Sequence, residues 1–125
     1  RRQRQMCIRD RCISKLYDMG VRRMIIKLGN YGMIYSYNEE TFFLPALLLD
    51  KVVDPTGAGD SFAGGFMGYL SSVNAYKEIE FKNACIYGTV MASLCVEDFG
   101  INKTVNLSEE EIENRRKLLL NQIKI

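Results

Sequence analysis

An aspartate stands beside a glycine-rich turn near the middle of the chain, in the sequence DPTGAGDSF over residues 54–62. Gly57 and Gly59 have no side chain, so a ligand can approach the backbone closely there. A helix is predicted to begin at Ala58, and the free N–H groups of a first helical turn bind anions. Asp60 falls in that turn. An acid beside an anion site suits phosphoryl transfer, in which N–H groups hold the phosphoryl group and a carboxylate accepts the proton of the attacking hydroxyl.

Two other glycine motifs do not fit this segment. A P-loop requires Lys and then Ser or Thr after its last glycine, whereas Asp60 and Ser61 follow Gly59. A dinucleotide-binding fingerprint requires a third glycine where Phe62 stands. The structural alternative is a plain glycine turn with a helix-capping acid, but a Gly-x-Gly in register with Asp54 and Phe62 is a much more specific pattern.

The composition excludes several classes of chemistry. The chain has 125 residues and no histidine, which rules out Ser-His-Asp and Cys-His catalysis and most zinc sites. Of its four cysteines, Cys85 and Cys95 are predicted to lie about 15 Å apart on one helix, too far for a disulfide. Reduced thiols, no secretory signal and no apolar run approaching ~20 residues predict a cytoplasmic protein without a membrane partner.

The basic balance of the chain belongs to its first twelve residues. The net charge is +2, and removing the five arginines and one aspartate of residues 1–12 leaves 12 basic and 14 acidic residues. No aromatic residue or glycine separates these arginines, so a nucleic-acid arm is not the favoured interpretation. Residues 1–12 are predicted to be a basic tail, foreign to the fold, and residues 13–125 to form the folded part.

Strands precede helices along the chain, which predicts an α/β fold. A helix is expected to end at Gly20. The predicted strands are Arg22–Leu28, Met33–Tyr37 and Thr41–Leu44, the first two joined by a Gly29–Gly32 turn into a hairpin. Residues 47–49 fit either a strand or a loop. The predicted helices are Ala58–Leu70, Glu78–Val96 and a last one capped by Ser108.

The run at residues 54–62 resembles the C-terminal signature of the PfkB or ribokinase-like kinases, Asp-Thr-x-Gly-Ala-Gly-Asp-x-Phe. The resemblance covers roughly Ile13–Ile125 and implies the C-terminal part of a layered α/β/α fold. It implies an ATP-dependent phosphotransferase acting on a sugar hydroxyl, with Mg²⁺ bridging the phosphates. Asp60 would be the base, and the N–H groups of Gly57, Ala58, Gly59 and Asp60 would form the anion hole.

A second segment resembles the nucleotide-binding strand end of the same family. It comprises Lys27, Gly29, Asn30 and Gly32, about two dozen residues before the central motif. The glycines would let the backbone approach ATP, and Lys27 would meet a phosphate. The alternatives are a plain hairpin turn and a lysine extended toward solvent. Thr56, Gly57 and Gly59 of the central motif complete the predicted nucleotide-binding residues.

Asp54 and Thr56 match the family positions that line a monovalent-cation site, where oxygen ligands are preferred. The segment at residues 96–100 lacks the Thr-Arg sequence of ribokinase-type members and departs from the cation-dependent pattern. Asn83 precedes an alanine, as in the family's nucleotide-facing Asn-Ala, but the matching position falls near Gly88. No adenine contact is therefore assigned to Asn83.

Two other functions stay open. One is a nucleoside kinase of the adenosine kinase type, and the other is a nucleotide-binding fragment without catalysis. The family's substrate glycines and its Mg²⁺-linked Asn-x-x-Glu segment would precede Ile13, so little turnover is expected from these residues alone. The expected partners are ATP and a small sugar or nucleoside, with no nucleic acid, and a homodimer is considered for the full-length protein.

Overall fold

The structure is a computed structural model that describes residues 11–38, 40–49, 56–73, 77–97 and 108–124. Residues 11–18 are helical. The strands are β1 (Arg23–Lys27), β2 (Met33–Tyr37) and β3 (Glu40–Leu44), and a 3₁₀ turn, η1 (Gly29–Tyr31), joins β1 to β2. The helices α2 (Ala58–Ser72), α3 (Glu78–Glu97) and α5 (Glu109–Ile123) follow.

The three strands form one antiparallel sheet in the order β1-β2-β3. Ile25 pairs with Tyr35, and Tyr35 pairs with Phe42, so these three side chains lie in one row on the same face. The predicted hairpin and the third strand are confirmed, with ends within one residue of those expected. The segment at residues 45–49, for which strand and loop were both open, has no regular structure.

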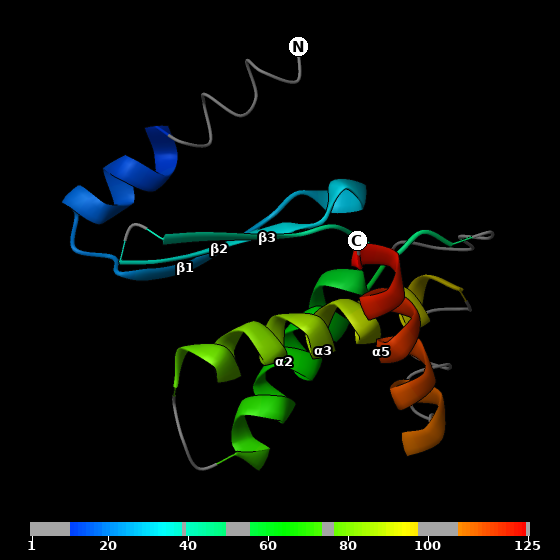
Figure 1. Cartoon of the computed structure of the whole chain (residues 1–125). Coiled ribbons are helices and arrows are strands. Elements are labelled where there is room, and N and C mark those ends of the chain that lie inside the picture. Colours follow the sequence, from blue (N-terminus) through cyan, green and yellow to red (C-terminus); the bar gives the residue numbers. More distant parts are fainter. Residues whose placement is uncertain (1–10, 39, 50–55, 74–76, 98–107, 125) are drawn as a thin grey trace.

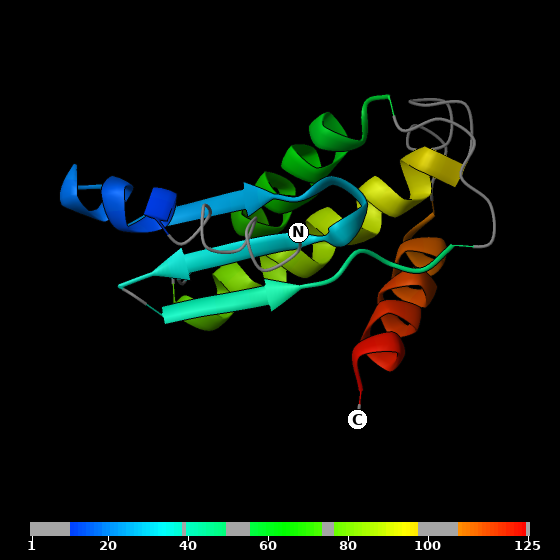
Figure 2. The same ribbon diagram turned by 90° about the horizontal axis from the view of Figure 1, so that it is seen from above.

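Helices α2 and α3 lie side by side across one face of the sheet, and α5 packs beside α3 (Figures 1 and 2). The core between the sheet and α2 and α3 contains Met33, Tyr35, Leu44, Phe62 and Cys85. A second core cluster joins the segment after β3 to α3 and α5 through Leu47, Val90, Leu94 and Leu119. These layers place the start of α2 against the end of β1.

The opposite face of the sheet is covered only in part within the described residues. The helix at residues 11–18 reaches it through Tyr17, whose hydroxyl lies 3.2 Å from the Ser36 hydroxyl. Phe43 on that face remains 51% exposed. Within the described residues, α2 and α3 therefore cover one face of the sheet, and residues 11–18 are the only helix on the other face.

Helix boundaries agree closely with the sequence patterns. Gly20 has φ +98°, the left-handed conformation expected after a helix end. Ser108 caps α5, and its hydroxyl accepts a hydrogen bond from the Glu111 N–H at 3.2 Å. Cys85 and Cys95 lie on α3 as buried free thiols, as predicted. Among the described helices, none combines the length and apolar character needed to cross a membrane.

Candidate phosphate-binding site

The first turn of α2 has the backbone geometry of an anion site. Gly57 is the N-cap residue, with φ 84° and ψ −3°, a left-handed conformation that favours glycine. The first helical hydrogen bond runs from the Ser61 N–H to the Gly57 carbonyl at 2.9 Å. The N–H groups of Ala58, Gly59 and Asp60 precede it and therefore have no acceptor within the helix. The predicted start of the helix at Ala58 is confirmed.

Cys95, near the end of α3, lies against this turn. The Cys95 thiol lies 3.7 Å from the Thr56 carbonyl oxygen, to which it donates a long hydrogen bond. A Cβ on Gly57 would also lie 3.7 Å from the Cys95 sulfur, an ordinary van der Waals contact. Space alone would admit a side chain at Gly57, so its left-handed backbone explains the glycine there.

Lys27 reaches the same turn from a distant part of the sequence. It is the last residue of β1, and its Nζ lies 3.2 Å from the place where a Cβ on Gly59 would stand. The same Nζ lies 4.9 Å from the centroid of the Phe62 ring. The structure thus brings an ammonium group to the N-terminus of α2, beside the glycine that leaves room for it. The contact with Phe62 was not predicted, since neither residue reveals the other's position in sequence.

Asp60 lies in the first turn of α2 with its side chain exposed. It forms no ion pair with another described residue. Its carboxylate is therefore not neutralised by a basic side chain within the described part of the chain. A carboxylate that is accessible beside free backbone N–H groups is suited to accept a proton from a bound hydroxyl.

The two glycines of the predicted nucleotide-binding turn have different surroundings. Gly29 has φ +61° and no atom within 4 Å of an added Cβ, so its backbone is open to a ligand. Gly32 has φ +106°, and a Cβ there would stand 2.2 Å from the Leu44 carbonyl oxygen. Packing against the end of β3 thus explains Gly32 without a ligand. Asn30 is exposed, and the nucleotide contact of this turn stays a prediction.

The predicted cation site lies largely outside the described residues. Asp54 and the segment at 98–107 belong to the parts of the chain that the structure leaves undescribed. Thr56 is described and exposed at the start of the turn. The described residues contain no cluster of three or more Cys, Asp or Glu side chains that could hold a metal ion.

Asn83 and Gly88 have structural contacts in α3. The Asn83 amide donates to the Glu80 carboxylate at 3.1 Å and to the Tyr69 hydroxyl at 3.4 Å. A Cβ on Gly88 would lie 2.8 Å from two carbons of the Phe62 ring. The absence of a side chain at Gly88 therefore leaves room for the Phe62 ring, over which Lys27 lies. Nothing in the sequence around Gly88 predicts this role.

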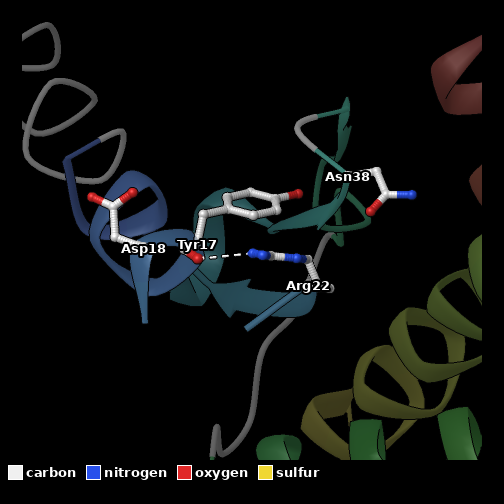
Figure 3. A pocket seen from close by; sticks show the side chains of 4 residues that line it. All are labelled: Tyr17, Asp18, Arg22 and Asn38. Carbon is white, nitrogen blue, oxygen red and sulfur yellow. Dashed lines mark hydrogen bonds between the residues drawn. The ribbon is translucent and has the colours of Figure 1, made fainter. Parts of the chain in front are cut away.

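A cavity at the other end of the sheet contains none of the predicted site residues. Its volume is about 460 Å³, and Tyr17, Asp18, Arg22 and Asn38 line it (Figure 3). Arg22 precedes β1 and Asn38 follows β2, whereas Lys27 ends β1. The Arg22 guanidinium donates to the Tyr17 carbonyl at 2.8 Å, so it serves to hold the helix end to the start of β1.

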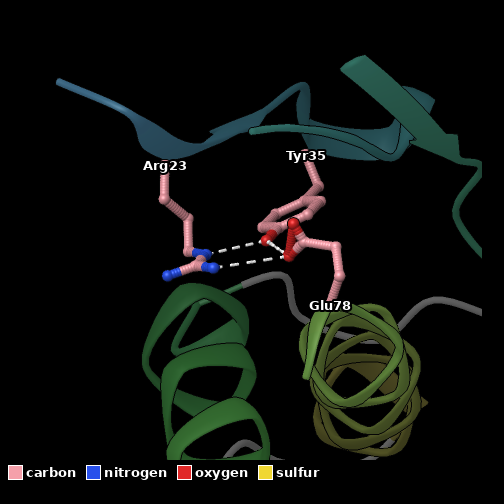
Figure 4. Close-up of polar contacts among 3 residues, drawn as sticks. All are labelled: Arg23, Tyr35 and Glu78. Carbon is pink, nitrogen blue, oxygen red and sulfur yellow. Dashed lines mark hydrogen bonds and ion pairs between the residues drawn. The ribbon is translucent and has the colours of Figure 1, made fainter. Parts of the chain in front are cut away.

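A polar network at that same end joins the sheet to α3. The buried Tyr35 hydroxyl donates to the Glu78 carboxylate and accepts a hydrogen bond from Arg23 at 2.9 Å (Figure 4). Burial and the hydrogen bond to Glu78 raise the pKa of Tyr35. Arg23 also stacks on Phe81, with its guanidinium carbon 3.7 Å from the ring centroid. This network fixes the start of α3, away from the glycine turn.

Comparison with known proteins identifies the family. The model of the pfkB family carbohydrate kinases matches residues 9–107, which include the β-sheet, the glycine turn and α3. The chain belongs to the PfkB family. The match begins at residue 9 and so includes the last four residues of the predicted tail. The predicted division at residue 12 stays a prediction.

Individual relatives of this PfkB chain act on different substrates. The aminoimidazole riboside kinase of Salmonella typhimurium is 41% identical over 76 residues, 56% of this chain and 24% of the relative. The ATP-dependent 6-phosphofructokinase of Thermoanaerobacterium thermosaccharolyticum is 41% identical over 69 residues, 54% of this chain and 21% of the relative. The chain thus spans about a quarter of these relatives' length.

Solved structures show the same fold. The ribokinase of Thermotoga maritima superposes with a TM-score of 0.68 and 33% identity, over 83% of this chain and 33% of that one. The fructokinase of Vibrio cholerae O395, crystallised with fructose, ADP and calcium, gives a TM-score of 0.73 at 19% identity, over 84% of this chain and 34% of that one. The PfkB chain therefore has the ribokinase-like fold, as predicted, and covers about a third of it.

Proposed function

We propose that this chain is the phosphate-binding and proton-accepting part of an ATP-dependent kinase that phosphorylates a hydroxyl of a sugar or nucleoside. The observation that carries this function is the meeting of Lys27 with the first turn of α2, where Nζ lies 3.2 Å from the Cβ position of Gly59. An ammonium group and free backbone N–H groups at one place form a site for a polyanion.

The N–H groups of Ala58, Gly59 and Asp60 would hold the migrating phosphoryl group. Negative charge is spread over its equatorial oxygens in the transition state, and preorganised N–H donors stabilise that charge without reorganisation. Gly57 sets the direction of these donors because its left-handed backbone turns the chain into the helix. Lys27 would neutralise charge on the nucleotide phosphates from the opposite side.

Asp60 would act as general base. Its exposed carboxylate would accept the proton of the substrate hydroxyl as the oxygen–phosphorus bond forms and the bond to ADP breaks. A protein that only binds nucleotides gains nothing from an acid beside phosphate, because the acid repels the ligand. This favours catalysis over simple nucleotide binding.

Mg²⁺, when bound, would neutralise charge between the phosphates. Gly29 and Asn30 would lie along the nucleotide, since they follow Lys27 by two or three residues, at most about 11 Å of extended chain. A monovalent cation at Asp54 and Thr56 remains part of the proposal.

The sugar and nucleoside alternatives differ in the acceptor, not in the phosphate site. A solved aminoimidazole riboside kinase of Salmonella enterica, bound to aminoimidazole riboside and an ATP analogue, has 31% identity and a TM-score of 0.70, over 81% of this chain and 33% of that one. A nucleoside kinase of Methanocaldococcus jannaschii is 29% identical over 98 residues, 78% of this chain and 30% of the relative. We favour a sugar hydroxyl and keep the nucleoside as the second candidate.

The test is an acceptor panel assayed with the longest natural gene product that contains these residues. ADP release from ATP and Mg²⁺ is measured with hexoses, sugar phosphates, ribosides and adenosine. We expect acceptor-dependent ADP release with one chemical class. ATP binding without release for any acceptor would instead support the non-catalytic nucleotide-binding module.

A further inference from the structure

The ammonium group of Lys27 lies where the backbone of α2, taken alone, would repel it. It lies against Gly59 in the first turn of α2, where the helix end has roughly half a positive charge. A flexible lysine side chain would move away from this charge into water unless another contact held it. Neither Lys27 nor Asp60 forms an ion pair with another described residue.

The Phe62 ring provides such a contact. Lys27 Nζ lies 4.9 Å from the ring centroid, within the distance of about 6 Å at which an aromatic face attracts a cation. The two side chains face each other across the interface between sheet and helices. Lys27 lies on the helix-facing side of β1, and Phe62 lies on the sheet-facing side of α2. The ring thus offsets part of the repulsion from the helix end.

The ring itself cannot turn away. Phe62 is 6% exposed, and its centroid lies 6.2 Å from that of Phe66 in a stacked arrangement. Gly88 of α3 lies so close to one edge of the ring that a Cβ there would stand 2.8 Å from two ring carbons. The ring is therefore a fixed surface that α2 and α3 present to Lys27.

We propose that Phe62 is a positioning residue for phosphate binding, which rests on the function proposed above. Its ring holds the Lys27 ammonium at the first turn of α2 before the nucleotide arrives. The affinity for the nucleotide is then higher, because Lys27 does not have to be ordered during binding. If Lys27 were in place in only a fraction of the molecules, the apparent affinity would fall by that fraction. Phe62 acts through Lys27 and does not touch the substrate.

Graded fluorination of the ring tests this role, because fluorine withdraws charge from the aromatic face and changes the ring's size little. Monofluoro-, difluoro- and trifluorophenylalanine are introduced at position 62 of the full-length protein, and the Kd of the ATP analogue AMP-PNP is measured with Mg²⁺. We expect a stepwise loss that reaches about threefold to tenfold, the range of a partly exposed cation–π contact. The same series at Phe66, whose ring has no cation over it within the described residues, should leave Kd unchanged.

Repeating the fluorination series in the Lys27→Met variant separates the phosphate-binding role of Lys27 from the positioning role of Phe62. We expect this variant to weaken AMP-PNP binding and to abolish the effect of fluorination at position 62. A flat series at Phe62 with Lys27 intact, equal losses at Phe66, or losses that persist without Lys27 would overturn the positioning role alone. Unchanged affinity in Lys27→Met would overturn the phosphate-binding role of Lys27, and the role of Phe62 with it.

A ligand-free measurement checks the contact directly. The ring current of Phe62 should shift the Lys27 ε-proton NMR resonance upfield in the free protein, and Phe62→Leu should abolish the shift while Phe66→Leu preserves it. An unshifted Lys27 resonance in the parent protein would show that the ammonium does not lie on the ring, and would refute the positioning role without reference to any nucleotide.

Discussion

At the scale of single residues, two side chains and one backbone turn lie where the end of β1 meets the start of α2. Lys27 supplies a positive charge, the turn after Gly57 supplies N–H donors, and Asp60 supplies an exposed carboxylate. Gly59 leaves room for the ammonium group. In the proposed mechanism each of these groups has a different function, so substitutions should separate nucleotide binding from turnover.

Asp60→Asn removes the base but preserves the shape of the side chain. Turnover should fall by roughly 10²–10⁴-fold, the range for loss of general base catalysis. AMP-PNP affinity should stay within a few-fold, because the N–H donors and Lys27 remain. Measurement of kcat and Kd checks this, with Asp18→Asn, an exposed acid at the opposite end of the sheet, as control. Wild-type turnover in Asp60→Asn would remove Asp60 from the mechanism.

Gly59→Val should harm nucleotide binding more than folding. An added Cβ would lie 3.2 Å from Lys27 Nζ, the flexible end of a side chain that can move away. The fold therefore tolerates the change, while Lys27 is displaced and the approach of phosphate is blocked. Thermal melting and AMP-PNP titration are compared with Gly64→Ala, where nothing lies within 4 Å. Normal binding by Gly59→Val would mean that the turn is only structural.

At the scale of elements, α2 and α3 cross at two glycines that allow the helices to touch. A Cβ on Gly65 would stand 2.8 Å from the Tyr87 carbonyl oxygen, and one on Gly88 would stand 2.9 Å from the Phe62 carbonyl oxygen. Backbone atoms cannot give way as a flexible side chain can. The close crossing also brings Cys95 under the glycine turn and Gly88 against the Phe62 ring, so it sets the geometry of the site.

Gly88→Ala should destabilise the chain by about 1–3 kcal/mol, the usual cost of overpacking a core. Gly68→Ala on α2 has open space around its Cβ and should instead stabilise by up to about 1 kcal/mol, because alanine favours a helix over glycine. Urea denaturation measures both free energies of unfolding. If both variants gained stability, the close crossing of α2 and α3 would not exist in solution.

At the scale of the whole molecule, the sheet is covered on one face and open on much of the other. In the part of the chain that the structure describes, β1 is an edge strand and residues 11–18 are the second layer. The chain covers about a third of the solved ribokinase-like structures. A layered α/β/α fold covers both faces of its sheet, so an open face and an unpaired strand edge favour association.

The chain expressed alone should therefore self-associate and bind a hydrophobic dye such as ANS. Phe43→Lys should reduce dye binding, because Phe43 is 51% exposed on the open face. Leu118→Lys is the matched control, since Leu118 is equally exposed at 51% but lies on α5. Light scattering and dye fluorescence give the readout. A monomer that melts cooperatively without binding dye would show a self-sufficient domain.

Local sequence patterns alone determined the elements and the motif. An apolar run and the turns between segments predicted the three strands, and hydrophobic spacing predicted the later helices. Ser108 marked the start of α5, and the glycine turn with Asp60 indicated a phosphate site before any contact was known. These signals are local, because side-chain period, capping and left-handed turns depend on residues a few positions apart.

Only the tertiary structure decided which distant residues share the site. The 34 residues between Lys27 and Phe62 contain nothing that predicts the 4.9 Å distance between the ammonium group and the ring centroid. In sequence, Gly32 fitted either a nucleotide contact or a plain hairpin turn. A Cβ at this position would lie 2.2 Å from the Leu44 carbonyl oxygen, so packing against β3 requires a glycine there. Gly88 became part of the site through the ring that it admits. Such contacts depend on how the layers of the fold pack together, and a single sequence gives no direct measure of that packing.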